Sequence, residues 1–161
     1  KGVFDMITVR NAQEGDEEAL LKLLGQVLLV HHKARPDLFQ EVGSKHSRED
    51  VTKMILDKEN PIFVAVDESG EVVGHCMCEF KLKDAPNLVY HKELHIDDLC
   101  IDENHRSLGI GRLLCEHAIN YAKEIGCYDV TLDVWEGNDS AKAFYENFGF
   151  NPYKYGMEII L

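Results

Sequence analysis

The chain has 161 residues, 45% of them hydrophobic, and a formal net charge of −12 at pH 7. This length and apolar content predict a single domain over residues 1–161 and exclude a disordered chain. The acidic balance excludes phosphate-backbone recognition, which depends on clustered Lys and Arg, so we expect no nucleic-acid partner. It favours approach by cations such as polyamines or basic peptide ends, although acidic composition also simply keeps a protein in solution.

The start of the chain and its cysteines bear on location. No apolar run approaches about 20 residues, so we expect no membrane partner. Residues 1–5 lack the apolar region and cleavage site of a secretory signal. Met6 opens the first periodic segment, and residues 1–5 are a leader if Met6 is the natural start. Five cysteines, an odd number without framework spacing, favour a reducing, cytoplasmic setting.

The first half of the chain predicts a short strand, two helices and a hairpin. The strand covers residues 7–10, and a helix over 14–30 follows with Leu20 and Leu23 on its apolar face. After a mixed loop over 31–46, Ser47 is the expected N-cap of a second helix. Strands over 62–66 and 72–80 form the hairpin.

The second half alternates strands with helices. Residues 94–101 predict a strand, 110–125 a strongly amphipathic helix ended by Gly126, and 128–134 another strand. A further helix follows Asn138, and 150–155 with 157–161 predict a second hairpin around Gly156. The order is therefore β-α-α-β-β-β-α-β-α-β-β.

A glycine-broken turn leads into the helix that begins at Ile110. Gly109 and Gly111 lack Cβ, so the backbone can take positive φ and its N–H groups can approach a ligand closely. The first free N–H groups of the helix point the same way, and this layout suits a phosphate or pyrophosphate. Neither a P-loop nor a full Gly-x-Gly-x-x-Gly is present, which disfavours both nucleotide folds.

Two motifs resemble the GNAT family of N-acetyltransferases. Residues 106–111 match Arg-x-x-Gly-x-Gly, and residues 138–150 match Asn-x-x-Ala-x-x-Phe-Tyr-x-x-x-Gly-Phe. With the acidic strand 96–101 the resemblance covers residues 94–150, and by element order the whole chain. It implies the α/β (α+β) GNAT fold: a mixed, largely antiparallel sheet of about seven strands, helices on both faces, and a V-shaped splay between strands four and five.

The resemblance also implies acetyl-CoA as cosubstrate, wedged in the splay. Its pantetheine arm would pair with strand backbone, and its phosphates would lie on the glycine turn. The implied binding residues are Leu99, Cys100, Ile101, Arg106, Ser107, Leu108, Gly109, Ile110, Gly111 and Asn138. Arg106 could instead lie on a solvated loop. Asn138 could serve as an N-cap alone or as a cap that also contacts the cofactor.

Tyr145 is the expected proton donor. The family's tyrosine at this place reaches the thioester sulfur, whereas a tyrosine at helical spacing is otherwise most often a core residue. Full transfer from a phenol of pKa about 10 to a thiolate of about 8.5 is uphill by roughly 2 kcal/mol, so Tyr145 would act mainly as a hydrogen-bond donor. By the same resemblance, the oxyanion takes a backbone N–H from residues 99–101.

Asp97 is the first candidate for the general base. It occupies the position where diamine acetyltransferases place a catalytic glutamate, and its shorter side chain favours a bridging water. Asp97 and Asp98 should face opposite ways on a strand, so at most one enters a given cleft. Glu79 is the second candidate and Glu93 the third, and a carboxylate paired with a lysine is the structural alternative.

The expected activity is acetyl transfer to a primary amine by direct attack in a ternary complex. An acyl-carrying Cys100 is an alternative mechanism, and a non-catalytic acyl-CoA-binding regulatory module is the alternative function. The loop over 31–46 should line the acceptor pocket, and the acidic charge favours a small amine or a peptide N-terminus. The resemblance also allows a homodimer.

We expect no metal. Cys76 and Cys78 should share one face of a strand as small buried apolar residues, and no matching ligand pair is visible. His31 and His32 are adjacent on a helix end, point in different directions and have no third ligand at a usual spacing.

Overall fold

A computed structural model describes residues 7–161. The expectation that residues 1–5 are a leader before Met6 concerns residues outside this range. The helices and strands are, in order, β1 (Thr8–Asn11), α1 (Glu17–Ala34), α2 (Arg48–Leu56), β2 (Ile62–Val66), β3 (Val72–Lys83), β4 (His91–Ile101), a 3-10 turn at Glu103–His105, α3 (Ile110–Glu124), β5 (Asp129–Leu132) and α4 (Asp139–Phe148). Within residues 7–161, no helix is both long and apolar enough to cross a membrane.

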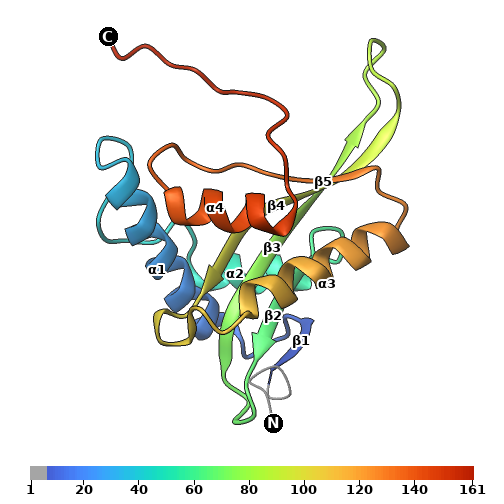
Figure 1. The fold of residues 1–161 in the computed structure, drawn as a ribbon. Helices are drawn as coiled ribbons and strands as arrows, with labels where there is room; N and C mark the ends of the chain where they lie inside the picture. The colour runs from blue at the N-terminus through green and yellow to red at the C-terminus, as the bar shows by residue number, and fades with distance from the viewer. Residues whose placement is uncertain (1–6) are drawn as a thin grey trace.

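One mixed sheet organises the fold. Its strand order is β1-β2-β3-β4-β5, with antiparallel pairing up to β4 and parallel pairing between β4 and β5. Helices cover both faces (Figure 1): α1 and α2 lie behind the sheet, and α3 and α4 lie in front. The expected fold class, including helices on both faces, is confirmed.

Two apolar clusters hold the layers together. On one face, α3 packs Ile110, Leu114 and Ala118 against Phe63 and Leu94 of the sheet. On the other face, α1 and α2 contribute Leu20, Leu23 and Val51, which pack with Met77 and Cys100. The periodic apolar residues of the sequence therefore point where the pattern predicted.

Local capping fixes where the helices begin and end. Ser47 forms the capping box expected of an N-cap: its hydroxyl accepts from the N–H of Asp50, whose carboxylate accepts from the N–H of Ser47. The side chain of Asn138 accepts from the N–H of Ala141 at the start of α4. Gly126 ends α3 with φ +75°, a left-handed conformation that favours glycine.

Within residues 7–161 the sheet has five strands, so the expectation of about seven was wrong. The difference lies in residues 150–161, which are rich in aromatic and branched apolar side chains but carry no secondary structure. Such residue types favour a strand, but a strand also needs a neighbouring backbone to bond. Among residues 7–161, these twelve residues form no ladder with another segment. The predicted second hairpin is therefore absent.

Candidate active site

The sheet opens between β4 and β5. Their pairing runs from Glu93–Asp129 to Ile96–Leu132 and then stops, while β4 continues for five more residues to Ile101. Among residues 7–161, β3 is the one strand that pairs with β4 over residues 97–101. This opening is the expected splay, and the N–H and C=O groups that point away from β3 there can bond an extended ligand, apart from the Ile101 carbonyl, which accepts from Arg106.

A β-bulge lies at the start of this open stretch. Met77 pairs with Asp98 and Cys78 with Ile96, so Asp97 is the extra residue of β4. The bulge breaks the side-chain alternation. Asp97 lines a cleft with Met54 of α2, and Asp98 contacts His75, which lies on the same face as Met77. The expectation that Asp97 and Asp98 face opposite ways was therefore wrong.

Asp98 is held by a histidine that the sequence reasoning missed. His75 Nε2 lies 2.6 Å from Asp98 Oδ2, His75 is fully buried, and its Nδ1 is buried without a partner among the described residues. Because the two residues are 23 positions apart on antiparallel strands, only the register of β3 and β4 could have revealed the pair.

The glycine turn leads from β4 into α3. Gly109 is the N-cap of α3 with φ +79°, and Ser107 also has positive φ. The N–H groups of Ile110 and Gly111 precede the first i−4 hydrogen bond of the helix, which Leu113 donates to Gly109. Leu108 is exposed and Ile110 is buried. The exposed turn thus has the form of an anion-binding helix start.

Arg106 is neither a free surface residue nor a fixed anion ligand in this structure. Its Nε donates to the carbonyl of Ile101 at 3.2 Å, which ties the turn to the last residue of β4. The side chain is exposed, so its remaining guanidinium N–H groups can still reach an anion at the turn.

Gly111 has a packing role. A Cβ on Gly111 would lie 3.2 Å from Cζ of Phe144, so the missing side chain lets α4 approach the start of α3. This contact places the helix that carries Tyr145 beside the turn. Gly111 was expected to bind the cofactor, and the close packing of Phe144 is a second reason for a glycine at this position.

A buried carboxylate anchors the turn to α1, and the sequence reasoning missed it. Asp102 lies 2.8 Å from Lys22 Nζ, accepts from Gln26, and caps the 3-10 turn through the N–H of Asn104. These contacts hold the pKa of Asp102 well below its usual value, and the contact with Lys22 has the largest effect. The Asp-x-Asn spacing was a visible capping signal.

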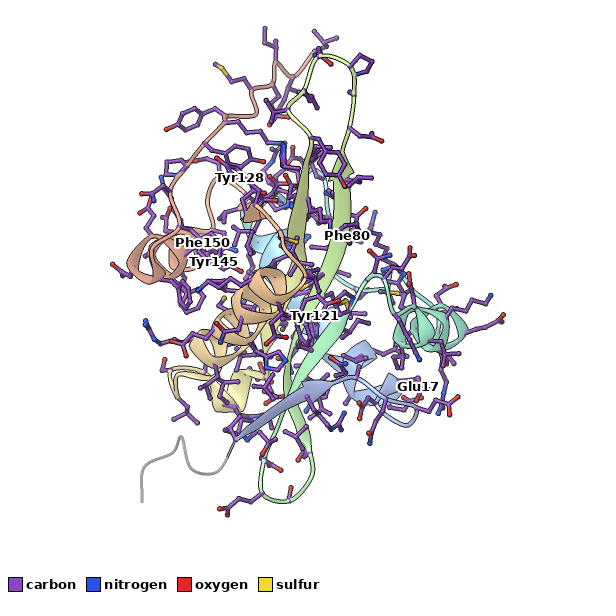
Figure 2. All side chains as sticks on the ribbon, turned by 90° about the vertical axis from the view of Figure 1, so that its right-hand side faces the viewer. Glu17, Phe80, Tyr121, Tyr128, Tyr145 and Phe150 are labelled. Carbon is purple, nitrogen blue, oxygen red and sulfur yellow. The ribbon has the colours of Figure 1, made fainter. Side chains whose placement is uncertain are left out.

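Tyr145 lies on the side of α4 that faces the sheet (Figure 2). Its ring packs against Phe144 at 5.1 Å and Phe150 at 5.6 Å between centroids. Burial raises the pKa of Tyr145 well above its usual value, and Cys115, Cys76 and Asp98 act in the same direction. Phe150 also packs against the apolar cluster under α3, so Tyr145 lies on that face of the sheet.

The Cys100 thiol is a poor nucleophile in this setting. Cys100 is buried, and burial, reinforced by Asp98, raises the pKa of its thiol to about 12. A thiol with this pKa carries almost no thiolate at neutral pH. The structure thus disfavours the alternative of an acyl-carrying Cys100.

The two leading base candidates share one cleft. A hollow of about 320 Å³ between α2 and the sheet is lined on its polar side by Lys45, Asp57, Asn60, Glu79 and Asp97. Both Asp97 and Glu79 are exposed, and Glu79 lies 3.3 Å from Lys81. Asn60 and the N–H of Glu59 hold the pKa of Asp57 below its usual value. Three carboxylates against the ammonium groups of Lys45 and the neighbouring Lys81 leave a net negative charge, which suits this cleft to a cation.

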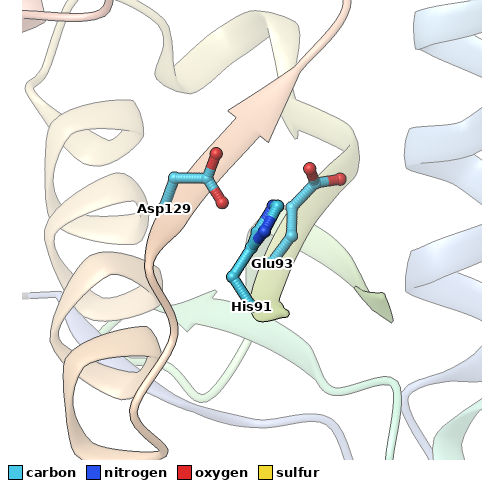
Figure 3. Close-up of side chains that lie close together, drawn as sticks. All are labelled: His91, Glu93 and Asp129. Atoms are coloured by element: carbon cyan, nitrogen blue, oxygen red, sulfur yellow. The ribbon is translucent and has the colours of Figure 1, made fainter. Parts of the chain in front are cut away.

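Glu93 lies outside this cleft, with His91 and Asp129 (Figure 3). The three side chains offer ligand atoms within 4.8 Å of one another, and they are the residues here that could hold a metal. Lys83 lies 3.6 Å from Glu93 and partly balances the charge. Burial, then Glu93, raises the pKa of Asp129. Glu93 is buried, contacts Lys83 and lies on the part of β4 that pairs with β5, so it is less suited to act as a base than Asp97 or Glu79.

Two cysteines and two histidines that were not expected to bind a metal make contacts of other kinds. Cys76 and Cys78 are both buried with their sulfurs 3.8 Å apart, as small apolar residues on one face. His31 packs on Phe39 at 5.0 Å, and His32 Nδ1 lies 2.8 Å from the carbonyl of Phe39. The loop after α1 is therefore held against the end of that helix.

Comparison with known proteins agrees with this geometry. Residues 28–150 match the model of the acetyltransferase (GNAT) family. The chain is 28% identical over 145 residues to the peptidyl-lysine N-acetyltransferase YjaB of Escherichia coli, covering 90% of this chain and 82% of that protein. It is 31% identical over 157 residues to the glucosamine 6-phosphate N-acetyltransferase of Trypanosoma brucei brucei, covering 96% of each.

A solved structure extends the likeness to the whole fold. A mutant of the BH1408 protein from Bacillus halodurans superposes with a TM-score of 0.90 at 32% identity, covering 96% of this chain and 99% of that one. The family match covers most of the chain, including the splay, the glycine turn and Tyr145. The chain therefore belongs to the GNAT family of acetyltransferases and is an acyltransferase enzyme.

Proposed function

We propose that the protein transfers the acetyl group of acetyl-CoA to a primary amine by direct attack in a ternary complex. The observation that carries this proposal is the unpaired edge of β4 over residues 97–101, which runs directly into the glycine turn and the start of α3. An extended pantetheine arm fits the open edge, and a pyrophosphate fits the free N–H groups of the turn. The GNAT family uses acetyl-CoA as cosubstrate in general.

The proposed roles follow the positions of the side chains. A backbone N–H within residues 99–101 stabilises the oxyanion, and Tyr145 donates a hydrogen bond to the leaving thiolate. Because burial raises the pKa of Tyr145, its hydroxyl stays protonated at neutral pH. The thiolate of CoA therefore takes a full proton only as the product leaves the site. Asp97, through a water, removes the proton from the attacking amine, with Glu79 as the second candidate.

We propose a cationic amine as acceptor. The cleft that holds Asp97 carries Asp57 and Glu79 as well, against Lys45 in its lining and Lys81 beside Glu79. By their names, two relatives act on peptidyl-lysine and on glucosamine 6-phosphate, and both acceptors carry a primary amine. The carboxylates of this cleft favour an alkyl ammonium or a peptide N-terminus and disfavour an acceptor with a phosphate.

The alternative of a non-catalytic acyl-CoA-binding module receives less support. A pure binder has no use for a tyrosine at the position of Tyr145 together with a carboxylate cleft on the α2 side of the sheet, and the chain belongs to a family of acyltransferases. The five free cysteines favour a reducing, cytoplasmic setting.

An amine panel tests the proposal. The full chain is incubated with acetyl-CoA and alkyl diamines, lysine-containing peptides, peptide N-termini or amino sugar phosphates, and free thiol release is followed. We expect turnover with one of the cationic amines and much less with the phosphorylated amino sugar. Thioester turnover that no amine accelerates, in a protein that binds acetyl-CoA, would support the binding module instead.

A further inference from the structure

Three side chains with metal-binding atoms meet where β4 and β5 begin to pair. His91 and Glu93 lie two residues apart on β4, and Glu93 is the register partner of Asp129, the first residue of β5. Their ligand atoms, one imidazole nitrogen and two carboxylate oxygens, lie within 4.8 Å of one another. Figure 3 shows the Asp129 carboxylate turned toward the His91 ring, with Glu93 alongside. This donor set is suited to zinc and similar divalent ions.

The ring of His91 is held in the tautomer that can bind a metal through Nε2. Its Nδ1 lies 2.8 Å from the carbonyl oxygen of Val89, and a carbonyl can only accept, so Nδ1 carries the proton. The lone pair of the neutral ring is then on Nε2. The ring also packs against Tyr128, with 5.4 Å between centroids. A backbone carbonyl behind the ring is a usual partner of a metal-bound histidine, because it fixes both tautomer and orientation.

The two carboxylates are only partly satisfied by the protein. Oδ1 of Asp129 is buried and has no hydrogen-bond partner among the described residues. The side chain of Glu93 is only 8% exposed, and Lys83 Nζ lies 3.6 Å from it, which is too long for a hydrogen bond. Buried charges and buried polar atoms are ordinarily paired, and an exception can mark an ion. Two such carboxylates side by side favour a cation between them.

We propose that His91, Glu93 and Asp129 bind a divalent transition-metal ion such as Zn²⁺. Nε2 of His91 and one oxygen of each carboxylate supply three ligands, and a water completes the shell. Tetrahedral zinc holds its ligand atoms about 3.3 Å apart, so small side-chain rotations close the present spacing. His91 and Asp129 are half-buried, which gives the ion a path from solvent, and the Lys83 side chain is exposed enough to move away from Glu93.

The proposed ion would tie β4 to β5 at the end of their pairing that lies away from the splay. The pairing begins at Glu93–Asp129 and stops at Ile96–Leu132, so the ion would hold the first pair and leave the open edge of β4 untouched. The inference is therefore independent of the acceptor that the enzyme uses. The expectation of no metal considered other cysteines and histidines, because His91 and Asp129 are brought together only by the parallel register.

Calorimetric titration of the full chain with zinc sulfate tests the site. We expect one ion per chain at this site and a rise in melting temperature with zinc. His91→Ala and Asp129→Asn should each lower the zinc affinity by about a hundredfold or more, because changes behind a metal ligand already cost about 10–100-fold. His46→Ala is the matched control. His46 is half-buried like His91 but lies on the loop before α2, so this variant should keep both zinc effects.

Lys83→Gln is a second test, which loss of folding cannot mimic. Removing the ammonium beside Glu93 should raise the zinc affinity by about three- to tenfold, because the ion no longer meets a like charge. Lys53→Gln, on the exposed side of α2, is the control and should change nothing. A chain that binds no zinc would overturn the proposal. Binding that survives both His91→Ala and Asp129→Asn would overturn it too, as would a Lys83→Gln variant that binds zinc no more tightly than the unaltered chain.

Discussion

His75 Nε2 lies 2.6 Å from Asp98 Oδ2, between adjacent strands and directly after the bulge at Asp97. His75 is fully buried and the Asp98 side chain is only 12% exposed, so neither group can exchange its partner for bulk water. The pair therefore fixes the first residues of the open edge of β4, on which the proposed cofactor site depends.

A double-mutant cycle measures this pair. His75→Gln and Asp98→Asn should each lower the free energy of unfolding by about 1–3 kcal/mol, because each leaves a buried polar group without its partner. Their coupling should exceed about 1 kcal/mol in urea unfolding. The exposed pair Arg48–Glu18, at 2.8 Å, is the control and should couple by less than about 1 kcal/mol. Additive effects at His75 and Asp98 would mean that the contact stabilises nothing.

Asp102 gives the protein a defined sensitivity to acid. Its pKa is lowered in the folded state, mainly by Lys22, so its contribution to stability is present above the ordinary value of 3.8 and is lost as the pH falls below it. Asp102→Asn should be less stable than the natural chain at pH 7, by about 2 kcal/mol, and the difference should shrink below pH 4. A difference that stays constant from pH 7 to pH 3 would contradict this explanation.

Tyr145→Phe should lower kcat by about tenfold to a thousandfold and leave the affinity for acetyl-CoA nearly unchanged. The aromatic contacts with Phe144 and Phe150 survive the change, so the melting temperature should hold. Since the pKa of Tyr145 is raised, the defect should be the same from pH 6 to pH 9. An intact kcat would reduce Tyr145 to a packing residue.

Asp97→Asn separates the two kinds of amine. An alkyl amine of pKa about 10.4 needs roughly 4–5 kcal/mol to lose its proton at pH 7, against about 1 for a peptide N-terminus. The variant should therefore have a lower kcat/KM at neutral pH, and the loss should be larger for an alkyl amine. The loss should shrink as the pH approaches the pKa of the amine.

Glu79→Gln is the matched comparison, because Glu79 lines the same cleft. It should have a smaller effect than Asp97→Asn on kcat/KM. A deficit that does not change with pH would indicate that Asp97 binds the ammonium. No deficit at all would move the role to Glu79 or to water.

Local signals predicted most of the fold. The apolar period of α3, the capping box at Ser47 and the glycine at 126 each act over a few residues, and each was placed correctly. Residues 150–161 were predicted as a hairpin around Gly156 because their residue types favour strands, and such a signal reports only on the segment itself. Pairing depends on a second backbone, which no local pattern in residues 150–161 contains.

The candidate site was harder to predict from the sequence than the fold, because its contacts also depend on residues far apart in the chain. The splay, the turn and Tyr145 follow motifs, but the facing of Asp97 and Asp98 depends on a bulge that appears only when β4 is set against β3. The partners of Asp98 and Asp102 lie 23 and 80 residues away, so their contacts are properties of the folded chain.

Amide hydrogen exchange with and without acetyl-CoA tests whether the cofactor binds along the open edge of β4 and at the glycine turn. We predict that acetyl-CoA slows exchange at residues 97–101 of β4 and at 107–112 around the start of α3, and raises the melting temperature. Gly109→Asp, which places a carboxylate at a backbone of φ +79°, should abolish both effects. Gly126→Asp, at φ +75° on the other end of the same helix, should not. If acetyl-CoA slowed exchange elsewhere in the chain and left the exchange of residues 97–101 unchanged, the proposed cofactor site would be wrong.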